Sequence, residues 1–279
     1  MWYIENKDIY IDMLTDSGVN AMSDRQTAAM HLADDSYAGS QTFARLKAAL
    51  KEVFGTDNVL PAHQGRAYEN ILAESFVKPG MVAIMNFHFT TTKAHVTRCG
   101  GEVVEVLHKK GLILQSDDPF KGDMDLQELR RVIEEYIPEK VAYVRVEAGT
   151  NLIGGQPVSF ENMLAVADIC HEYGVPSVLD ASLLQDNIYF MKTREAQCKY
   201  MTPKEIYHLL VQDLRQLVLG IMQILHITLI GSSFSTSTRS SLNISLIRYR
   251  KSIKILIPCS KCVKKSKIWL GLCKIMCKT

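Results

Sequence analysis

Residues 141–180, VAYVRVEAGTNLIGGQPVSFENMLAVADICHEYGVPSVLD, decide the fold class of this chain. A β-rich run at 141–146 is followed by a loop rich in glycine, and then by an amphipathic stretch at 160–173. A second β-rich run, 176–179, ends on Asp180. Strand, helix and strand in this order predict a βαβ unit, in which the two strands are parallel.

The same alternation extends toward the N-terminus. Further β-rich runs occupy 81–85 and 103–107, and further amphipathic helices are predicted over 41–54 and 126–136. Apolar strands that alternate with helices predict an α/β fold with a mainly parallel sheet covered on both faces. Such sheets bind ligands at the carboxyl ends of their strands.

Capping residues mark the ends of the predicted helices. Gly55 follows the first of them, and Asp125 with Glu128 has the spacing of a capping box before the second. Ser159 precedes the helix at 160–173, and Gly174 follows it.

Charge divides the chain near residue 213. All 30 Asp and Glu lie at or before Asp213, so residues 1–213 carry 20 Lys and Arg and a net charge of −10. Residues 214–279 carry 12 Lys and Arg and no acid, a net charge of +12, and they show no capped helix or strand-turn alternation. We therefore predict a folded domain over 1–213 and a basic, poorly ordered tail over 214–279.

Composition excludes several classes of protein. With 279 residues, 47% hydrophobic and 22% charged, the chain is neither intrinsically disordered nor collagen-like. Nothing before Asp213 reaches the roughly 18 apolar residues of a membrane span, and the start has no secretion signal. We expect no membrane partner.

The cysteines indicate a reducing, cytoplasmic setting, because their uneven scatter does not form a disulfide framework. Cys259, Cys262, Cys273 and Cys277 loosely resemble a four-thiolate zinc site, but turn glycines are missing around them. The lysines among them could indicate nucleic-acid binding, but a basic tail without regular aromatic interleaving is usually only a charged segment. We expect neither zinc nor nucleic acid.

Two segments could hold an anion or move a proton. Gln64, Gly65 and Arg66 follow a short β-rich run and precede a helix starting near Ala67, so backbone amides and a guanidinium could face a phosphate. A tight turn with a surface arginine is the alternative. Tyr37 could donate a proton, or could simply be a packed tyrosine.

Three further candidates follow predicted strands. Asp180, at a strand tip, could hold a proton on a heteroaromatic nitrogen, and Asn151 could donate to a ligand hydroxyl from the neighbouring strand. Phe89 could stack on a planar ligand. The alternatives are a helix cap or solvated strand end for Asp180, a turn asparagine for Asn151 and a core side chain for Phe89.

Taken together, these segments resemble the pyridoxal-phosphate-dependent aromatic β-eliminating lyases, the family of tryptophanase and tyrosine phenol-lyase. The resemblance covers about residues 8–213. It rests on the segments LTDSGVNAMSD (14–24), DSYAGS (35–40), PAHQGR (61–66), FTTT (89–92), NLIGGQPVS (151–159) and NIYFMK (187–192). It implies the large domain of the pyridoxal-phosphate-dependent transferase-like fold (fold type I), with the small C-terminal domain missing.

The resemblance also implies roles for the cofactor-binding residues. Gln64, Gly65 and Arg66 would hold the cofactor phosphate, and Phe89 would stack on the pyridine ring. Two further contacts would reach the ring, from Asn151 to its hydroxyl and from Asp180 to its nitrogen.

Catalytic and cation-binding roles are implied as well. Tyr37 matches a tyrosine that assists departure of the aromatic leaving group, and Thr15 matches a substrate-contacting threonine. Gly18 and Asp35 fall near a monovalent-cation (potassium) site, where Asp35 replaces the usual glutamate.

The chain also departs from the family pattern. Leu183 stands where the family usually has an arginine that contacts the ring hydroxyl, and the Ser-x-Lys-Lys segment with the cofactor-binding lysine is absent after Asp213. A shifted reading frame would explain an acid-free tail that begins where the resemblance stops. The rival interpretation is a genuine fused tail.

The family activity is elimination of indole from tryptophan, or of phenol from tyrosine, with release of pyruvate and ammonia. Both substrates stay open, with a slight preference for tryptophanase as the commoner member. We expect the literal chain to be inactive without its lysine segment, so the alternative is a non-catalytic fragment that binds cofactor or a partner. The family is homo-oligomeric, which we do not extend to this chain.

Overall fold

A computed structural model describes residues 24–34, 39–55, 60–62, 65–213, 217–219 and 254–257. Of these, residues 24–46 belong to one structural unit and the remainder to a second. The first unit contains α1 (Asp24–His31) and the beginning of α2 (Gln41–Phe54), which continues into the second.

Asp34 caps the N-terminus of α2 within the first unit. Its carboxylate accepts hydrogen bonds from the backbone N–H groups of Gln41 (2.7 Å) and Thr42 (2.9 Å) and from Ser40 Oγ (3.0 Å). Hydrogen bonds from Thr42, together with those from Gln41 and Ser40, hold the pKa of Asp34 well below its ordinary value. An ionised acid at this position also stabilises the positive end of the helix dipole.

A seven-stranded sheet, in the order β1-β7-β6-β5-β4-β2-β3, forms the centre of the second unit. The strands are β1 (Leu60–Ala62), β2 (Val82–Met85), β3 (Glu102–Glu105), β4 (Val141–Glu147), β5 (Ser177–Asp180), β6 (Leu217–Leu219) and β7 (Lys254–Ile257). Strands β3, β2, β4, β5 and β6 are parallel to one another, whereas β7 is antiparallel to both β6 and β1. The expected mainly parallel α/β sheet is therefore confirmed.

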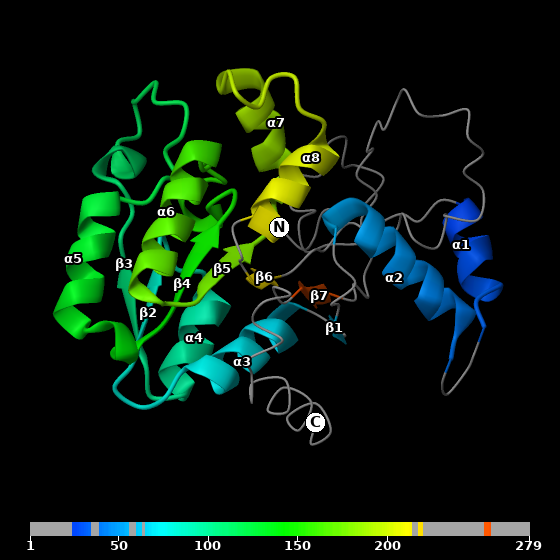
Figure 1. Cartoon of the computed structure of the whole chain (residues 1–279), viewed down its shortest axis with the longest axis horizontal. Helices are drawn as coiled ribbons and strands as arrows, with labels where there is room; N and C mark the ends of the chain where they lie inside the picture. The colour runs from blue at the N-terminus through cyan, green and yellow to red at the C-terminus, as the bar shows by residue number, and fades with distance from the viewer. Residues whose placement is uncertain are drawn as a thin grey trace, which may run out of the picture. The chain divides into compact units, whose positions relative to one another are not determined.

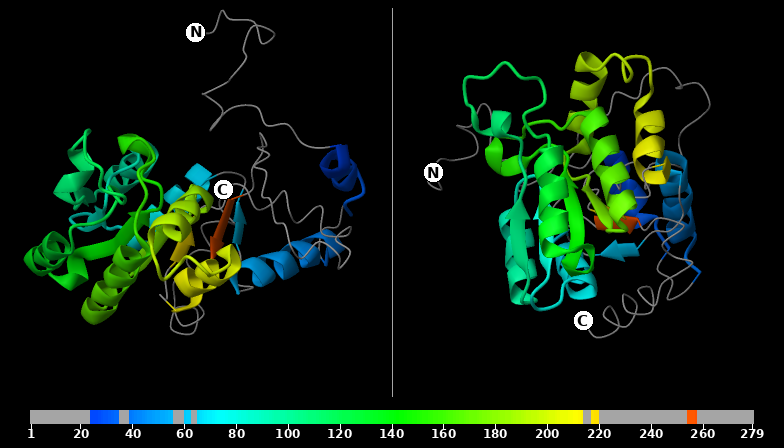
Figure 2. Two further views of the ribbon diagram at one scale, coloured as in Figure 1. Left: turned by 90° about the horizontal axis from the view of Figure 1, so that it is seen from above. Right: turned by 60° about the vertical axis from the view of Figure 1, so that its left-hand side comes forward.

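Helices cover the sheet (Figures 1 and 2). Those of the second unit are α3 (Gly65–Phe76), α4 (Thr90–Arg98), α5 (Leu126–Tyr136), α6 (Phe160–Tyr173), α7 (Leu184–Arg194) and α8 (Pro203–His208). Short helical turns η2 (Lys109–Leu112), η3 (Pro138–Lys140), η4 (Asn151–Ile153) and η5 (Leu209–Asp213) lie between them. In Figure 1, α5 and α6 lie side by side, and so do α3 and α4.

Apolar side chains of α3 and α4 form a buried cluster with the sheet. Tyr68 and Leu72 of α3 and Val96 of α4 meet Met85 of β2 and Val178 of β5 there. All seven residues of β4 are buried, so both faces of this central strand are covered. Burial on both faces explains why the sequence of β4 does not alternate between apolar and polar residues.

The sequence predicted several helix boundaries to the residue, because local signals set them. The helices predicted at 41–54, 126–136 and 160–173 are observed with those limits. Ser159 Oγ accepts a hydrogen bond from the backbone N–H of Asn162 (3.1 Å), and Gly174 ends α6 in the left-handed conformation, with φ of 68°.

The capping box expected before α5 is only half formed. Asp125 Oδ1 accepts hydrogen bonds from the backbone N–H groups of Gln127 and Glu128, both at 3.1 Å. Glu128 does not return the bond, because its carboxylate pairs with Arg131 at 2.6 Å and the N–H of Asp125 donates to Val106 O at 2.8 Å. The carbonyl oxygen of Val106, directly after β3, thus takes the place of the Glu128 carboxylate as the acceptor for the N–H of Asp125.

Two short segments of the basic tail, β6 and β7, lie within the sheet. The rest of the tail falls outside the described residues, and its poor order stays a prediction. Among the helices that the structure describes, none has the length and apolar character needed to cross a membrane.

Candidate functional site

Three neighbouring parallel strands end in polar residues at one edge of the sheet. Glu147 ends β4 and pairs in register with Asp180, which ends β5. Asn86 directly follows β2, the strand on the other side of β4. The chain order changes direction around β2, since β3 lies on one side of it and β4 on the other. Ligands of open α/β sheets bind at such a position.

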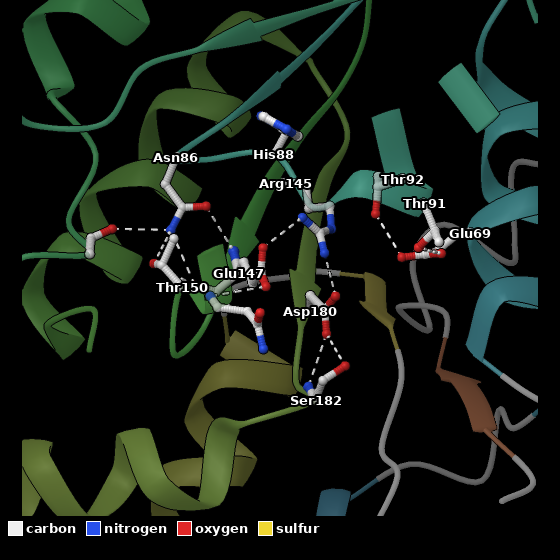
Figure 3. A network of polar contacts seen from close by, with 12 residues as sticks. Glu69, Asn86, His88, Thr91, Thr92, Arg145, Glu147, Thr150, Asp180 and Ser182 are labelled. Atoms are coloured by element: carbon white, nitrogen blue, oxygen red, sulfur yellow. Dashed lines mark hydrogen bonds and ion pairs between the residues drawn. The ribbon is translucent and has the colours of Figure 1, made fainter. Parts of the chain in front are cut away.

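Arg145 occupies the centre of this edge and is wholly buried, with 0% of its surface exposed. Figure 3 shows its guanidinium between the carboxylates of Glu147 and Asp180. Nη1 donates to Glu147 Oε2 at 3.3 Å, and Nη2 forms an ion pair with Asp180 Oδ2. A buried charge is tolerated only when it is paired and hydrogen-bonded, which these contacts provide.

Burial and charge act in opposite directions on these groups. Burial opposes the charge of Arg145, but the carboxylates of Asp180 and Glu147 outweigh it and raise the pKa of Arg145 above its ordinary value. Burial raises the pKa of Glu147, with a further contribution from Asp180, while Arg145 works against that rise. The guanidinium therefore stays charged, and Glu147 ionises less readily than an exposed glutamate.

Asp180 keeps capacity for one more hydrogen-bond donor. Its Oδ1 accepts from the backbone N–H of Ser182 at 2.9 Å and from Ser182 Oγ at 2.5 Å, and its Oδ2 accepts from Arg145. A carboxylate can accept about four hydrogen bonds, so one position is left. The strand-end acid is thus oriented on both oxygens and can still bind a protonated ligand atom.

Asn151 lies next to this group through its backbone. Its N–H donates to Glu147 Oε1 at 3.3 Å, and its carbonyl oxygen accepts from Gly154 at 3.0 Å. The side-chain amide of Asn151 forms no hydrogen bond within the described part of the chain, so it is available to a ligand. Glu147 thereby links the backbone of Asn151 to Arg145, which in turn contacts Asp180.

Asn86 fixes the loop on the far side of β4. Its Nδ2 donates to Gly122 O (3.0 Å), Glu147 O (3.1 Å) and Thr150 Oγ1 (3.1 Å). Its Oδ1 accepts from the backbone N–H of Glu147 at 3.0 Å. The end of β4, and with it the carboxylate of Glu147, is held by a side chain that is itself wholly buried.

Glu69, in the second turn of α3, connects this helix to the first turn of α4. This buried acid accepts hydrogen bonds from Thr91 Oγ1 (2.5 Å) and Thr92 Oγ1 (2.7 Å). Phe89 is the residue before α4 and is half-buried. The structure therefore brings the second turn of α3 close to the start of α4.

Gly65 and Arg66 are the first two residues of α3, where unpaired backbone N–H groups point outward. Gly65 is buried and Arg66 is exposed. A helix N-terminus with an adjacent arginine can bind an anion such as phosphate.

Half of the predicted site residues can be placed in the structure. Gly65, Arg66, Phe89, Asn151 and Asp180 all lie at a helix N-terminus or at a strand end of the second unit. Residues Thr15, Gly18, Asp35, Tyr37 and Gln64 lie outside the described residues, and so do the four tail cysteines. Their roles stay predictions.

Sequence reasoning missed Arg145, Glu147, Glu69 and Asn86. A signal was present for three of them, because charged residues interrupt an apolar strand at 145 and 147 and an apolar helix face at 69. Charges in such positions are paired when buried. The sequence could not name their partners.

Leu183 lies against the loop that follows β4. A Cβ added to Gly149 would lie 2.8 Å from Leu183 Cβ, so the two residues are in close contact. Gly149 has a φ of 77°, and its N–H donates to Asn187 Oδ1 at 3.0 Å. The position that the resemblance assigns to an arginine is thus filled by an apolar side chain.

Residues 12–208 match the beta-eliminating lyase family. Among curated relatives, the tyrosine phenol-lyases of Fusobacterium nucleatum and Clostridium tetani are each 42% identical over 205 residues, which is 74% of this chain and 45% of theirs. The enzyme of Pasteurella multocida is 41% identical over 203 residues, covering 73% of this chain and 44% of its own. The chain thus spans less than half the length of these relatives.

Solved structures agree on the fold. An alanine aminotransferase from Pyrococcus furiosus matches with a TM-score of 0.56 at 13% identity, covering 90% of this chain and 55% of its own. An archaeal alanine:glyoxylate aminotransferase matches with a TM-score of 0.51 at 18% identity, covering 83% of this chain and 47% of its own. The large-domain fold of the pyridoxal-phosphate-dependent transferases, fold type I, is confirmed.

Proposed function

Because this chain belongs to the beta-eliminating lyase family, we propose that its sheet domain is the pyridoxal-phosphate-binding region of an aromatic amino-acid lyase. One observation carries the proposal. Asp180, at the end of β5, and Asn151, in the turn η4 after β4, each keep a free hydrogen-bonding position and are linked through Arg145 and Glu147. The edge of the sheet where they lie is the ligand-binding edge of this kind of fold.

The residues present fit the cofactor. A pyridine ring needs an acid for its nitrogen and a donor for its hydroxyl, and the carboxylate of Asp180 and the amide of Asn151 supply them. The phosphate needs a helix N-terminus and a cation, which Gly65 and Arg66 supply. Phe89 is half-buried at the start of α4 and offers the flat surface on which the ring would stack.

When bound, the cofactor supplies an electron sink for cleavage of bonds at the amino-acid α-carbon. The chain supplies position and charge. Asp180 holds a proton on the ring nitrogen, which keeps the ring electron-poor, and Asn151 orients the ring through its hydroxyl. Tyr37 would give a proton to the departing aromatic group, and Thr15 would contact the substrate.

The substrate in this proposal is an aromatic amino acid, with tyrosine favoured over tryptophan because the similar relatives are named tyrosine phenol-lyases. The products would be phenol, pyruvate and ammonia. We include in the proposal a monovalent cation, potassium, near Gly18 and Asp35, and assembly of the complete enzyme as a homo-oligomer.

A second candidate is a cofactor-binding fragment without activity. It is favoured by one observation, the absence of a Ser-x-Lys-Lys segment after Asp213. Covalent catalysis needs a lysine fixed within bonding reach of the cofactor aldehyde, and scattered tail lysines do not provide one.

Equilibrium titration with pyridoxal phosphate tests the cofactor site. Arg66→Ala should weaken binding by about 1.5–3 kcal/mol, the size of a lost charge-assisted hydrogen bond, or about 10- to 150-fold in Kd. Arg130→Ala is the matched control, because this exposed arginine pairs with Glu172 between α5 and α6. Equal affinities of wild type and Arg66→Ala would remove the phosphate assignment.

A second experiment separates the two candidates. The full chain is incubated with pyridoxal phosphate and either tyrosine or tryptophan, and pyruvate is measured; borohydride reduction and peptide mapping then locate any modified lysine. We expect cofactor binding without pyruvate. Pyruvate release together with one stoichiometrically modified lysine would show that this chain is a working enzyme and that the fragment candidate is wrong.

A further inference from the structure

Arg145 and Glu147 make no contact with the cofactor in the function proposed above, although both are charged side chains inside the fold. Arg145 is wholly buried and Glu147 is 6% exposed. Their removal from water has an electrostatic cost, which a purely structural apolar pair at the same positions would avoid. A buried ion cluster at a ligand-binding edge is therefore a candidate for a functional role.

The charges in this cluster do not cancel. One guanidinium, Arg145 on β4, stands beside Glu147 on the same strand and Asp180 on β5. Glu69 on α3 adds a third carboxylate that acts on Arg145 through its charge. Three carboxyl groups therefore surround one guanidinium, so the cluster holds more acidic groups than basic ones and is complementary to a cationic ligand atom.

The contact between Glu147 and Arg145 determines how much negative charge remains at the carboxylate of Asp180. The ion pair with Arg145 by itself would neutralise Asp180 and weaken its hold on a protonated ring nitrogen. Because Nη1 of Arg145 also binds Glu147, at 3.3 Å, the guanidinium is shared between two carboxylates. Negative charge is thereby left over at the strand tip.

Arg145 and Glu147 also orient the two predicted ring contacts. Arg145 orients Oδ2 of Asp180, and Glu147 orients the backbone N–H of Asn151 at 3.3 Å. Arg145 contacts both Glu147 and Asp180 (Figure 3), so the pair links Asp180 at the end of β5 to Asn151 in η4. A shift of either side chain would move one ring contact relative to the other.

We propose that Arg145 and Glu147 are positioning residues of the cofactor-ring site, which set the spacing of Asp180 and Asn151 and the negative charge offered to the ring nitrogen. This inference rests on the proposed function. The two residues have opposite effects on the ring nitrogen: Glu147 favours its protonated form, and Arg145 disfavours that form.

The test uses the full chain and pyridoxal phosphate labelled with ¹⁵N in the ring. The ring ¹⁵N chemical shift at pH 8 reports protonation, and equilibrium dialysis reports Kd. Glu147→Gln should move the shift toward that of the neutral ring and raise Kd about tenfold or more, the effect of one lost charge-assisted contact. Glu172→Gln, which removes an exposed glutamate paired with another arginine, should change neither value.

The double variant Arg145→Met/Glu147→Gln separates charge from packing. It removes one charge of each sign, so the surplus of negative charge returns, and we expect the ring shift to return to that of the wild type. The Kd should stay above that of the wild type, because a methionine in place of Arg145 no longer orients Asp180 Oδ2. A merely structural role predicts no such return of the ring shift. If Glu147→Gln is too unstable by circular dichroism to be loaded, the double variant decides alone.

The outcomes distinguish this inference from the proposed function. Binding by the wild type with an unchanged ring shift and Kd in Glu147→Gln, or a neutral ring in the double variant, would overturn the inference and leave the cofactor site standing. Failure of the wild-type chain to bind labelled cofactor at all would overturn both.

Discussion

Replacement of Asn86 by alanine should be among the most destabilising single changes at the site edge of this fold. The side chain is wholly buried, and its four hydrogen-bonding contacts, at 3.0–3.1 Å, reach Gly122, Glu147 and Thr150. The amide has two protons for three acceptors, so about three net bonds are lost, at about 1 kcal/mol each. The N–H of Glu147 is also left without a partner, which adds about 1 kcal/mol more.

The expected loss of about 3–4 kcal/mol is a large part of the 5–15 kcal/mol that a folded domain typically has. Urea unfolding followed by circular dichroism measures it, and the midpoint should fall by about 1–2 M for a slope of about 2–3 kcal/mol per molar. Asn70→Ala is the matched control, because Asn70 is half-buried on α3 and both of its hydrogen bonds are exposed: its amide donates to Glu74 at 3.3 Å, and its oxygen accepts from Arg98. We expect it to cost about 0.5 kcal/mol or less.

Asn86→Asp tests whether the amide of Asn86 is needed as a hydrogen-bond donor. A carboxylate at this position would face the oxygens of Gly122, Glu147 and Thr150 without a proton to give them, so at pH 7 it should destabilise more than alanine does. If Asn86→Ala costs less than about 1 kcal/mol, or no more than Asn70→Ala, the reasoning that this asparagine holds the end of β4 is refuted.

Further predictions concern other described residues. Burial raises the pKa of Cys170 to about 12 and that of Cys198 to about 11, so iodoacetamide at pH 8.5 should leave both unmodified in the folded chain, and peptide mapping that finds either alkylated before unfolding would contradict this. Burial raises the pKa of Glu195, although two backbone hydrogen bonds act in the opposite direction. The protonated form of Glu195 therefore contributes to stability fully below the unfolded pKa of about 4.3, and this contribution is lost as pH rises through the folded pKa. Glu195→Gln should therefore reduce the decline of the urea midpoint above about pH 4.3, and an unchanged pH profile would argue against it. Ser159→Ala removes the N-cap bond of α6 and should cost about 1 kcal/mol in urea unfolding, whereas no loss would show that another group caps this helix. Gly149→Ala combines a φ of 77° with a Cβ 2.8 Å from a leucine side chain, so it should lower the thermal midpoint, and a wild-type midpoint would mean that the loop adapts.

The sequence determined the elements whose signals are local. The limits of α5 and α6 follow from apolar periodicity and from capping residues within one turn, and Asp180 is placed at a strand end by the run that precedes it. Since these signals act over a few residues, no tertiary contact was needed to predict them.

The sequence also determined the family, because many short segments match it in order over residues 12–208. It did not determine the local competition at α5. There, the carboxylate of Glu128 could accept a hydrogen bond from the N–H of Asp125 or form an ion pair with Arg131. It pairs with Arg131, because the N–H of Asp125 donates instead to Val106 O, just after β3, at 2.8 Å.

Only the tertiary structure decided which strands are neighbours and which charges meet. The partner of Arg145 is Asp180, 35 residues away, and Asn86 meets Glu147 across 61 residues. Strand β1, at Leu60–Ala62, pairs with β7, at Lys254–Ile257, from the opposite end of the chain. Such pairings depend on the register of the strands and on their order in the sheet, which the alternation of apolar and polar residues does not encode. A charged residue in a buried strand indicates that a partner exists, but the identity of the partner is set by the sheet.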